Sequence, residues 1–421
     1  MARAENINPD ILVWARESAG LSLEEAAERL GITSTERSSA VEKLEEIEAG
    51  VKFPTRNQLM RISQVYRRPL ITFYMKHPPR KGERGEDFRT LPASVSSRDN
   101  ANLDALLRDI RARQEMVKSL LEDEEETQPL PFVASATINQ GVGVVAKSIA
   151  AAVGFDPETQ RRRSANTSAD DLFRELRLRI EAIGVFVLLV GDLGSHHSAI
   201  SETVFRGFAI ADKIAPFIII NDQDARTARS FTMIHELGHI WLGQTGISGT
   251  ADKVEPATPH GRIEQFCNDV AGEFLLPSSA FQRKPQELDA GNKESASRLI
   301  TQLAQTWGVS EPMVAYRFHR LGWINAGLYR ELTSDYAARW NALKERTKEK
   351  ARETEGGPSY YTVKQFKLGN ALIDVVRRTL RDNLLTHTKA AKVLGVKPSS
   401  VEPLLRNLER SRGAFVSDLR G

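Results

Sequence analysis

Residues 231–243 read Phe231-Thr-Met-Ile-His235-Glu236-Leu-Gly-His239-Ile-Trp-Leu-Gly243 and combine a helical pattern of apolar residues with the motif His-Glu-x-x-His. Two histidines four residues apart on an α-helix lie on one face, so both imidazoles can reach one metal ion. Glu236 then points toward the open side of that metal, where it can accept a proton from a bound water. We predict a catalytic Zn²⁺ site with His235 and His239 as ligands and Glu236 as general base. The alternative is a helix that carries two core histidines.

A catalytic zinc ion needs a third protein ligand, because the fourth position is kept for water. Residues 263–277 predict a second helix, since their apolar residues recur at helical spacing. Glu264 lies beside this apolar stripe, and Asn268 follows one turn later in the same direction. Glu273 points roughly the opposite way, because nine residues at about 100° each come near a half turn. We favour Glu264 over Glu273 as the third ligand, and we expect the Asn268 amide to orient one of the two histidines.

Four blocks of sequence carry a resemblance to a known family. They are Arg206-Gly-Phe-Ala, Ala215-Pro-Phe-Ile-Ile-Ile-Asn221, Ser230-Phe-Thr-Met-Ile-His-Glu-Leu-Gly-His239 and Glu264-x-x-x-Asn268-x-x-Ala271-x-x-Phe274-Leu-Leu-Pro277. In this order, within residues 165–285, they resemble the ImmA/IrrE family of zinc metallopeptidases. The resemblance implies a gluzincin-like core with Glu264 as the third zinc ligand. It also implies cleavage of a protein substrate, often a transcriptional repressor.

The N-terminal segment resembles the Xre-type helix-turn-helix domain that several members of this family carry. Short helical stretches lie on either side of a tight turn, and Ser22 followed by Glu25 gives the spacing of a capping box. The candidate recognition region, residues 41–48, contains four glutamates and one lysine. Because duplex binding depends mainly on basic residues that neutralise phosphates, this composition disfavours DNA. DNA binding and a role in protein interaction or dimerisation both remain open for this domain.

The remaining pattern predicts an α+β, mostly helical fold in which the peptidase core is zincin-like with a small β-sheet. Short β-branched runs at 184–190 and 217–220 predict strands, and residues 102–121, 142–153 and 170–183 predict helices. The C-terminal region is helical and has a helix-turn-helix-like spacing around Gly395, which generic helix packing also produces. We predict five parts: a helix-turn-helix domain (1–79), a linker and long helix (80–130), the metallopeptidase domain (131–285), a helical subdomain (286–355) and a C-terminal helical domain (356–421).

Composition is compatible with this organisation. A chain of 421 residues is too long for one ordinary core, and a net charge of +3 does not indicate a nucleic-acid-binding protein. The single cysteine, Cys267, excludes an internal disulfide framework and suits a reducing cytoplasm. No signal segment opens the chain, and no apolar run is long enough to span a bilayer. We expect a cytoplasmic protein with no membrane partner, with a homodimer as one possible assembly.

Three further histidines attract attention. His196 and His197 lie in a run rich in glycine and serine, which predicts either a plain surface loop or a substrate contact. His260 lies just before the second predicted helix of the zinc site. It is interpreted either as a donor to the oxyanion of the reaction or as an ordinary turn residue.

The predicted function is hydrolysis of a peptide bond in a specific protein partner. A transcriptional repressor is the expected substrate, in a regulatory, stress or mobile-element response. Two other classes remain open. The chain is alternatively a helix-turn-helix transcriptional regulator, with possible DNA contacts, or an antitoxin-like protein that binds a partner. In both alternatives the peptidase module acts as a sensor.

Overall fold

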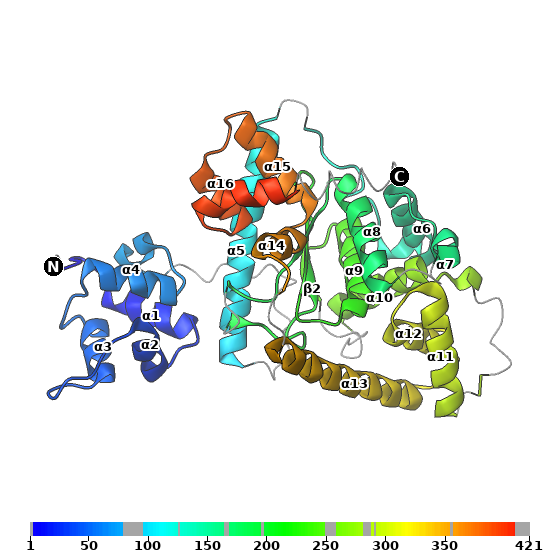
Figure 1. Ribbon diagram of the computed structural model, residues 1–421, viewed down its shortest axis with the longest axis horizontal. Helices are drawn as coiled ribbons and strands as arrows, with labels where there is room; N and C mark the ends of the chain where they lie inside the picture. The colour runs from blue at the N-terminus through cyan, green and yellow to red at the C-terminus, as the bar shows by residue number, and fades with distance from the viewer. Residues whose placement is uncertain are drawn as a thin grey trace. The chain divides into compact units, whose positions relative to one another are not determined.

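A computed structural model describes residues 3–78, 96–124, 127–163, 168–194, 198–248, 258–280, 288–289, 292–353 and 357–408 (Figure 1). The chain divides into two compact units. The first unit comprises Met1–Ile110 and Asp192–Ile200, and the second comprises Arg111–Gly191 and Ser201–Gly421. Residues 80–95 of the expected linker, and both His196 and His197, lie outside the described residues.

The first unit contains four short helices, α1 (Pro9–Ser18), α2 (Leu23–Leu30), α3 (Ala40–Glu48) and α4 (Arg56–Val65), followed by the 3₁₀ helix η1 (Leu70–Tyr74). A capping box begins each of α2, α3 and α4, at Ser22, Ser39 and Thr55. In each box the side chains satisfy amide groups that the first helical turn leaves without partners. The capping box predicted at Ser22 and Glu25 is thus present, and the apolar faces of the helices pack into a core of their own.

One glutamate of the candidate recognition region is not on the surface. Glu48 is 7% exposed and accepts hydrogen bonds from Arg16 and from the Tyr66 hydroxyl. Burial raises the pKa of Glu48, and the hydrogen bonds and charge of Arg16 oppose that shift. Because the Glu48 carboxylate is buried and paired, the acidic surface of α3 consists of Glu42, Glu45 and Glu46.

The long helix α5 (Ser97–Glu122) is longer than the predicted 102–121 and contributes residues to both units. The second unit then continues with η3 (Ile138–Gln140), α6 (Val142–Val153), α7 (Pro157–Arg163), α8 (Ala169–Ala182), η6 (Arg226–Ala228), α9 (Arg229–Leu242), α10 (Pro259–Leu275) and η8 (Ser278–Ala280). The last helices are α11 (Lys293–Trp307), α12 (Glu311–Arg320), α13 (Ala326–Glu353), α14 (Tyr360–Leu368), α15 (Asn370–Arg381), α16 (His387–Leu394) and η9 (Pro398–Ser400), and helical residues 401–408 follow. The predicted helices at 142–153 and 170–183 are confirmed.

A four-stranded sheet of order β1-β3-β2-β4 lies in the second unit. Its strands are β1 (Phe186–Leu189), β2 (Gly207–Ile210), β3 (Phe217–Ile220) and β4 (Gly246–Ser248). β1 runs parallel to β3, whereas β2 runs antiparallel to both β3 and β4. The predicted strands at 184–190 and 217–220 are therefore confirmed, and the mostly helical α+β class holds. The sequence interpretation did not include β2 and β4.

Helix α9 packs against β2 and β3 on one side and against α8 and α10 on the other (Figure 1). One hydrophobic cluster joins the sheet to these helices and continues into α11, α12 and α13. Since α9 is surrounded by other elements, its residues from Ser230 to Trp241 are almost all buried. The His-Glu-x-x-His motif is thus held by the core of the second unit.

A buried ion pair joins α8 to the junction of α14 and α15. Arg177 donates to Glu181 and to the backbone carbonyls of Phe366, Lys367 and Val187. The other oxygen of Glu181 accepts from the amides of Asn370 and Ala371, at 3.1 and 3.3 Å. Both ionic side chains are only 6% exposed. Every charged atom of this pair therefore has a partner.

Among the described residues, no helix combines the length and the apolar character that a membrane crossing requires.

Candidate metal centre

Two adjacent helices, α9 and α10, supply the candidate site. α9 ends at Leu242, and the next residue, Gly243, has a φ of 69°, the left-handed conformation that favours glycine. Where α9 faces α10, a Cβ added to Gly238 would lie 3.4 Å from the Cys267 sulfur. A glycine at this position lets the two helix backbones approach closely, which brings the side chains of both helices into one cluster.

The cluster contains the three predicted ligands. The Nε2 atom of His239 lies 3.1 Å from Glu264 Oε1, and the Nε2 atom of His235 lies 3.3 Å from Glu264 Oε2. The two Nε2 atoms are 3.1 Å apart. One ligand atom from each residue can be chosen so that all three lie within 4.8 Å of one another. His235 and Glu264 are 29 positions apart along the chain, and the structure brings them together with His239.

Glu236 lies beside this cluster without a hydrogen bond. Its side chain is completely buried, and neither carboxylate oxygen has a partner. Burial raises the pKa of Glu236 to about 7, against the opposing charges of His235 and His239. A carboxyl group with this pKa can both accept and release a proton near neutral pH.

Gly207 of β2 makes room for this carboxylate. A Cβ at position 207 would lie 2.7 Å from Glu236 Oε1 and 2.8 Å from a methyl group of Thr232. Such distances are too short for a real contact, so a larger residue would push Glu236 aside. Gly207 belongs to the Arg206-Gly-Phe-Ala block. The sequence alone did not show why this block needs a glycine.

His239 and Glu264 perturb each other strongly. Burial alone raises the pKa of Glu264, but the charge of His239 and hydrogen bonds from both histidines outweigh burial and hold this pKa well below its usual range. The pKa of His239 is raised in turn: burial lowers it, and Cys267 and Glu264 more than compensate. The two opposite shifts have a common cause, because the charged imidazole and the charged carboxylate favour each other.

Glu273, the competing candidate for the third ligand, lies elsewhere. Its carboxylate accepts hydrogen bonds from Arg317 and from Ser278, at 2.6 Å in each case. Arg317 is 5% exposed, so this is a largely buried structural pair. The half-turn separation of Glu264 and Glu273 along α10 is thus seen directly.

Asn268 is buried one turn after Glu264, but the expected hydrogen bond to an imidazole is not formed in this structure. The Nδ1 atoms of both His235 and His239 lack a hydrogen-bond partner. The Nε2 atom of His235 is instead 2.9 Å from the hydroxyl of Ser248 on β4. Ser248 was not singled out from the sequence, because nothing in a three-residue strand indicates which helix it will approach.

His260 lies on α10 and not in a turn. It is one helical turn before Glu264, with its Nε2 atom 3.9 Å from Glu264 Oε1. Its side chain is 28% exposed, whereas those of His235, His239 and Glu264 are at most 8% exposed. His260 therefore lies on the more accessible side of the cluster.

The donor set fits a transition-metal ion. Two imidazole nitrogens and one carboxylate are a ligand combination found in catalytic zinc sites. The unpaired oxygens of Glu236 provide a base beside that ligand set and would not be explained by core packing. The site residues thus satisfy both the composition and the proximity that a metal centre requires.

Comparison with known proteins agrees with this geometry. Residues 190–319 match the sequence model of the family described as Peptidase_M78, IrrE N-terminal-like domain. This region is therefore similar to metallopeptidases of the IrrE/ImmA type. The match includes the whole of α9 and α10, and with them all three residues of the cluster. No curated protein and no solved structure matches the chain significantly.

Proposed function

We propose that the protein is a zinc-dependent metalloendopeptidase that hydrolyses a peptide bond in a specific protein partner. The observation that carries this proposal is the convergence of His235, His239 and Glu264 next to the buried, unpaired carboxylate of Glu236. The match to a metallopeptidase family over the same residues supports it.

Each residue of the cluster has a distinct role. His235, His239 and Glu264 would hold Zn²⁺, which when bound polarises a carbonyl group and makes a water molecule more acidic. Glu236 accepts the proton of the attacking water on its carboxylate and later donates it to the leaving amine. The buried surroundings of Glu236 keep other water away, so the proton stays available for the amine.

An extended segment of the substrate fits the edge of the sheet next to the site. Within the described residues, β4 pairs with β2 alone, so the other side of this strand presents unpaired backbone groups. A strand edge of this kind can bind a peptide through backbone hydrogen bonds. Ser248 of β4 lies against His235, so a chain aligned on β4 would pass close to Glu236 and the ligands. A transcriptional repressor in the cytoplasm remains the substrate that we propose.

Metal content tests the ligand set. We expect the purified full-length protein to contain about one zinc ion per chain, because the His₂Glu site has a single set of ligands. Glu264→Ala should lose the metal. Glu273→Ala is the matched control on the same helix, and it should keep the metal since Glu273 pairs with Arg317. Absence of zinc in the wild-type protein, even after titration with Zn²⁺, would contradict the proposal.

Cleavage can be tested before the substrate is identified. The proteome of the source organism is incubated with the zinc-loaded protein or with its Glu236→Gln variant, and new N-termini are labelled and identified by mass spectrometry. We expect a small number of cleavage sites that require Glu236. Identical sets of N-termini in both reactions would show that the chain does not act as a peptidase on these proteins.

DNA binding is a second candidate function, and the C-terminal region favours it more than the N-terminal region does. α16 ends at Leu394 and is followed by Gly395, which has a φ of 59°, and a second helical segment begins at Pro398. Lys392, Lys397 and Arg406 are exposed on this helix-turn-helix-like segment, whereas α3 exposes glutamates. We expect the full chain to bind a short DNA duplex with a salt dependence that Lys392→Glu and Lys397→Glu weaken. Unchanged binding in these variants would exclude this segment as the DNA-binding surface.

A further inference from the structure

His260 and Glu264 lie one above the other on the first two turns of α10. The helix begins after Thr258, whose hydroxyl accepts a hydrogen bond from the amide of Gly261 at 2.9 Å. This cap fixes the first turn, which contains His260. Residues four apart on a helix are neighbours, and side chains lean toward the N-terminus of a helix. The carboxylate of Glu264 therefore extends back toward the imidazole of His260.

The two oxygens of this carboxylate face the two predicted histidine ligands in the structure. Oε1 of Glu264 lies 3.1 Å from His239 Nε2, and Oε2 lies 3.3 Å from His235 Nε2. The Nε2 atom of His260 is 3.9 Å from Oε1, which is longer than a hydrogen bond. His260 is thus next to the carboxylate without being bonded to it, and His239 is closer to the same oxygen.

Binding of a metal ion would change the partners of Glu264. A histidine nitrogen that binds a metal carries no hydrogen, so the Nε2 atoms of His235 and His239 could no longer donate to the carboxylate. One oxygen of Glu264 would serve as the ligand, and the other would lose its donor. The side chain of Glu264 is only 8% exposed, so water cannot readily replace that donor. A buried acceptor without a donor is unfavourable, and the loaded site therefore needs another donor here.

His260 can provide this donor. A neutral imidazole has one N–H group, and the 28% exposure of the side chain leaves room for it to rotate. A movement of about 1 Å would bring Nε2 within hydrogen-bonding distance of Glu264 Oε1. His260 is not itself in the group of close ligand atoms, which among the described residues comprises His235, His239 and Glu264. The imidazole is thus placed to act on the ligand and not on the metal.

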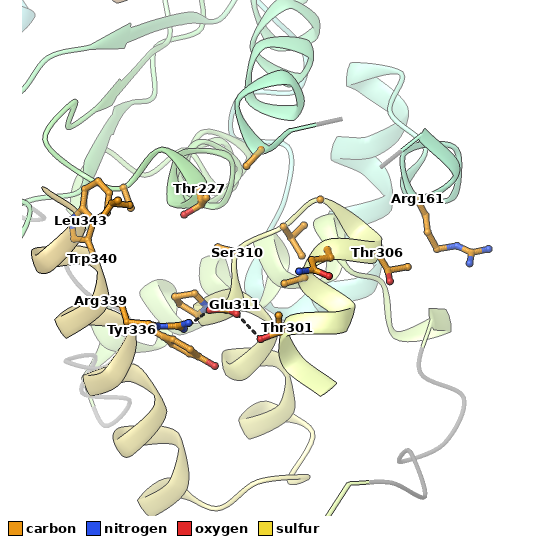
Figure 2. A pocket seen from close by; sticks show the side chains of 17 residues that line it. Arg161, Thr227, Thr301, Thr306, Ser310, Glu311, Tyr336, Arg339, Trp340 and Leu343 are labelled. Atoms are coloured by element: carbon orange, nitrogen blue, oxygen red, sulfur yellow. Dashed lines mark hydrogen bonds and ion pairs between the residues drawn. The ribbon is translucent and has the colours of Figure 1, made fainter. Parts of the chain in front are cut away.

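A groove elsewhere in the second unit does not reach the metal centre. It has a volume of about 1010 Å³ and is lined mainly by η6, by the junction of α11 and α12, and by α13 (Figure 2). In this groove Glu311 pairs with Arg339 and accepts a hydrogen bond from Thr301 (Figure 2). None of the described residues that line it belongs to the metal centre. The polar groups of the groove therefore do not provide the donor for Glu264.

We propose that His260 is a positioning residue of the metal centre, which donates a hydrogen bond to the oxygen of Glu264 that does not bind the metal. The proposal rests on the metal site of the proposed function and deepens it. With one oxygen held by His260, Glu264 uses only the other oxygen as a ligand, and the fourth position of the metal stays free for water. In this role His260 acts through Glu264 and does not contact the substrate.

The test measures the zinc affinity of the full-length protein by competition with a chromophoric chelator. His260→Ala removes the donor and should weaken zinc binding by about 10- to 100-fold, the usual effect of losing a hydrogen bond to a metal ligand. His260→Gln should restore most of this loss, because the amide nitrogen of glutamine is as many bonds from Cα as the Nε2 atom of histidine. His260→Asn should not restore it, because the amide nitrogen of asparagine corresponds to Nδ1.

Two controls separate this role from an effect on folding. Arg262→Ala removes an exposed side chain from the first turn of α10, and it should leave the zinc affinity unchanged. Without zinc, His260→Ala should unfold at the same denaturant concentration as the wild-type protein, because His260 has no hydrogen bond to Glu264 to lose. With zinc, the variant should be less stable than the wild type, since weaker binding gives less stabilisation.

The outcomes distinguish this inference from the proposed function. Equal zinc affinity of the wild-type protein and His260→Ala, or a loss that glutamine and asparagine restore equally, overturns the positioning role and leaves the metal site in place. A wild-type protein that binds zinc with the expected dependence on His260 but cleaves no protein would support the positioning role and contradict the peptidase. A wild-type protein that takes up no zinc contradicts both.

Discussion

Two buried clusters of charged groups in the second unit differ in how well their hydrogen bonds are satisfied. In the cluster of Arg177 and Glu181, each guanidinium nitrogen donates and each carboxylate oxygen accepts. In the metal centre, both oxygens of Glu236 and the Nδ1 atoms of both histidines have no partner. Burial penalises any unpaired polar group, so the second cluster is costly for folding. The difference indicates that the first cluster serves stability, and it supports the metal-binding and proton-transfer roles that we propose for the second.

The largest effect is expected at the base of the metal centre. Glu236→Gln should retain zinc and lower the rate of cleavage by about 10²- to 10⁴-fold, because general base catalysis is lost. The unfolding free energy of the metal-free protein should change by less than about 1 kcal/mol, since the carboxylate has no hydrogen bond to lose. Zinc analysis, cleavage kinetics and chemical denaturation check the three parts. Full activity of this variant would remove Glu236 from the mechanism.

The opposite behaviour is expected at the satisfied cluster. Arg177→Ala leaves a buried carboxylate and three carbonyl groups without their partner, so we expect a loss of about 3–5 kcal/mol in unfolding free energy. Chemical denaturation measures this loss. Arg174→Ala is the control on the same helix, because the pair of Arg174 with Asp171 is exposed and should contribute less than about 1 kcal/mol. Similar stability of the two variants would show that the buried pair does not hold the α14–α15 junction.

Gly207 offers a more selective way to disturb the metal centre. In Gly207→Ala the new methyl group displaces the carboxylate of Glu236, and a shift of this kind should lower the cleavage rate by about 100-fold. Zinc content should stay unchanged, because Glu236 is not among the ligands. Gly143→Ala on α6 is the matched control, since a Cβ there meets nothing within 4 Å. If both alanine variants cleave at the wild-type rate, Gly207 does not position the base.

The smallest effect concerns Ser248. In the metal-free protein its hydroxyl lies 2.9 Å from His235 Nε2, so Ser248→Ala should cost about 1 kcal/mol of unfolding free energy. With zinc bound, the nitrogen serves as a ligand, and the difference between the two proteins should disappear. Denaturation curves with and without Zn²⁺ provide the comparison. A loss of equal size in both states would mean that Ser248 does not compete with the metal for this nitrogen.

Much of the candidate metal centre was predictable, because the spacing of residues within one helix determines which side chains share a face. The spacing of His235 and His239 places both on one helix face, and the half-turn between Glu264 and Glu273 separates the true member of the cluster from its competitor. Helical periodicity alone also gave α6, α8 and α10, with errors of a few residues at their ends. These features depend on the geometry of a single helix and not on what packs around it.

The remaining features depend on contacts between distant parts of the chain. Gly207 matters because β2 lies against α9, and Ser248 matters because β4 ends beside His235. The pair of Arg177 and Glu181 looks like an ordinary i,i+4 surface pair in the sequence, but α14 and α15 bury it. The hydrogen bond that we expected from Asn268 to a histidine is not formed, for a related reason. The position of a residue on a helix gives the direction of its side chain but not the atom that this side chain reaches.

The glycine contact that joins α9 to α10 has a practical consequence. Cys267, the sole cysteine of the chain, is 0% exposed in this interface. A thiol reagent in solution can reach it only when the two helices separate. The rate of labelling therefore reports how often α9 and α10, the two helices of the candidate metal centre, separate in the native protein. No engineered probe is needed for this experiment, because the natural chain already carries a single reporter at the position that matters.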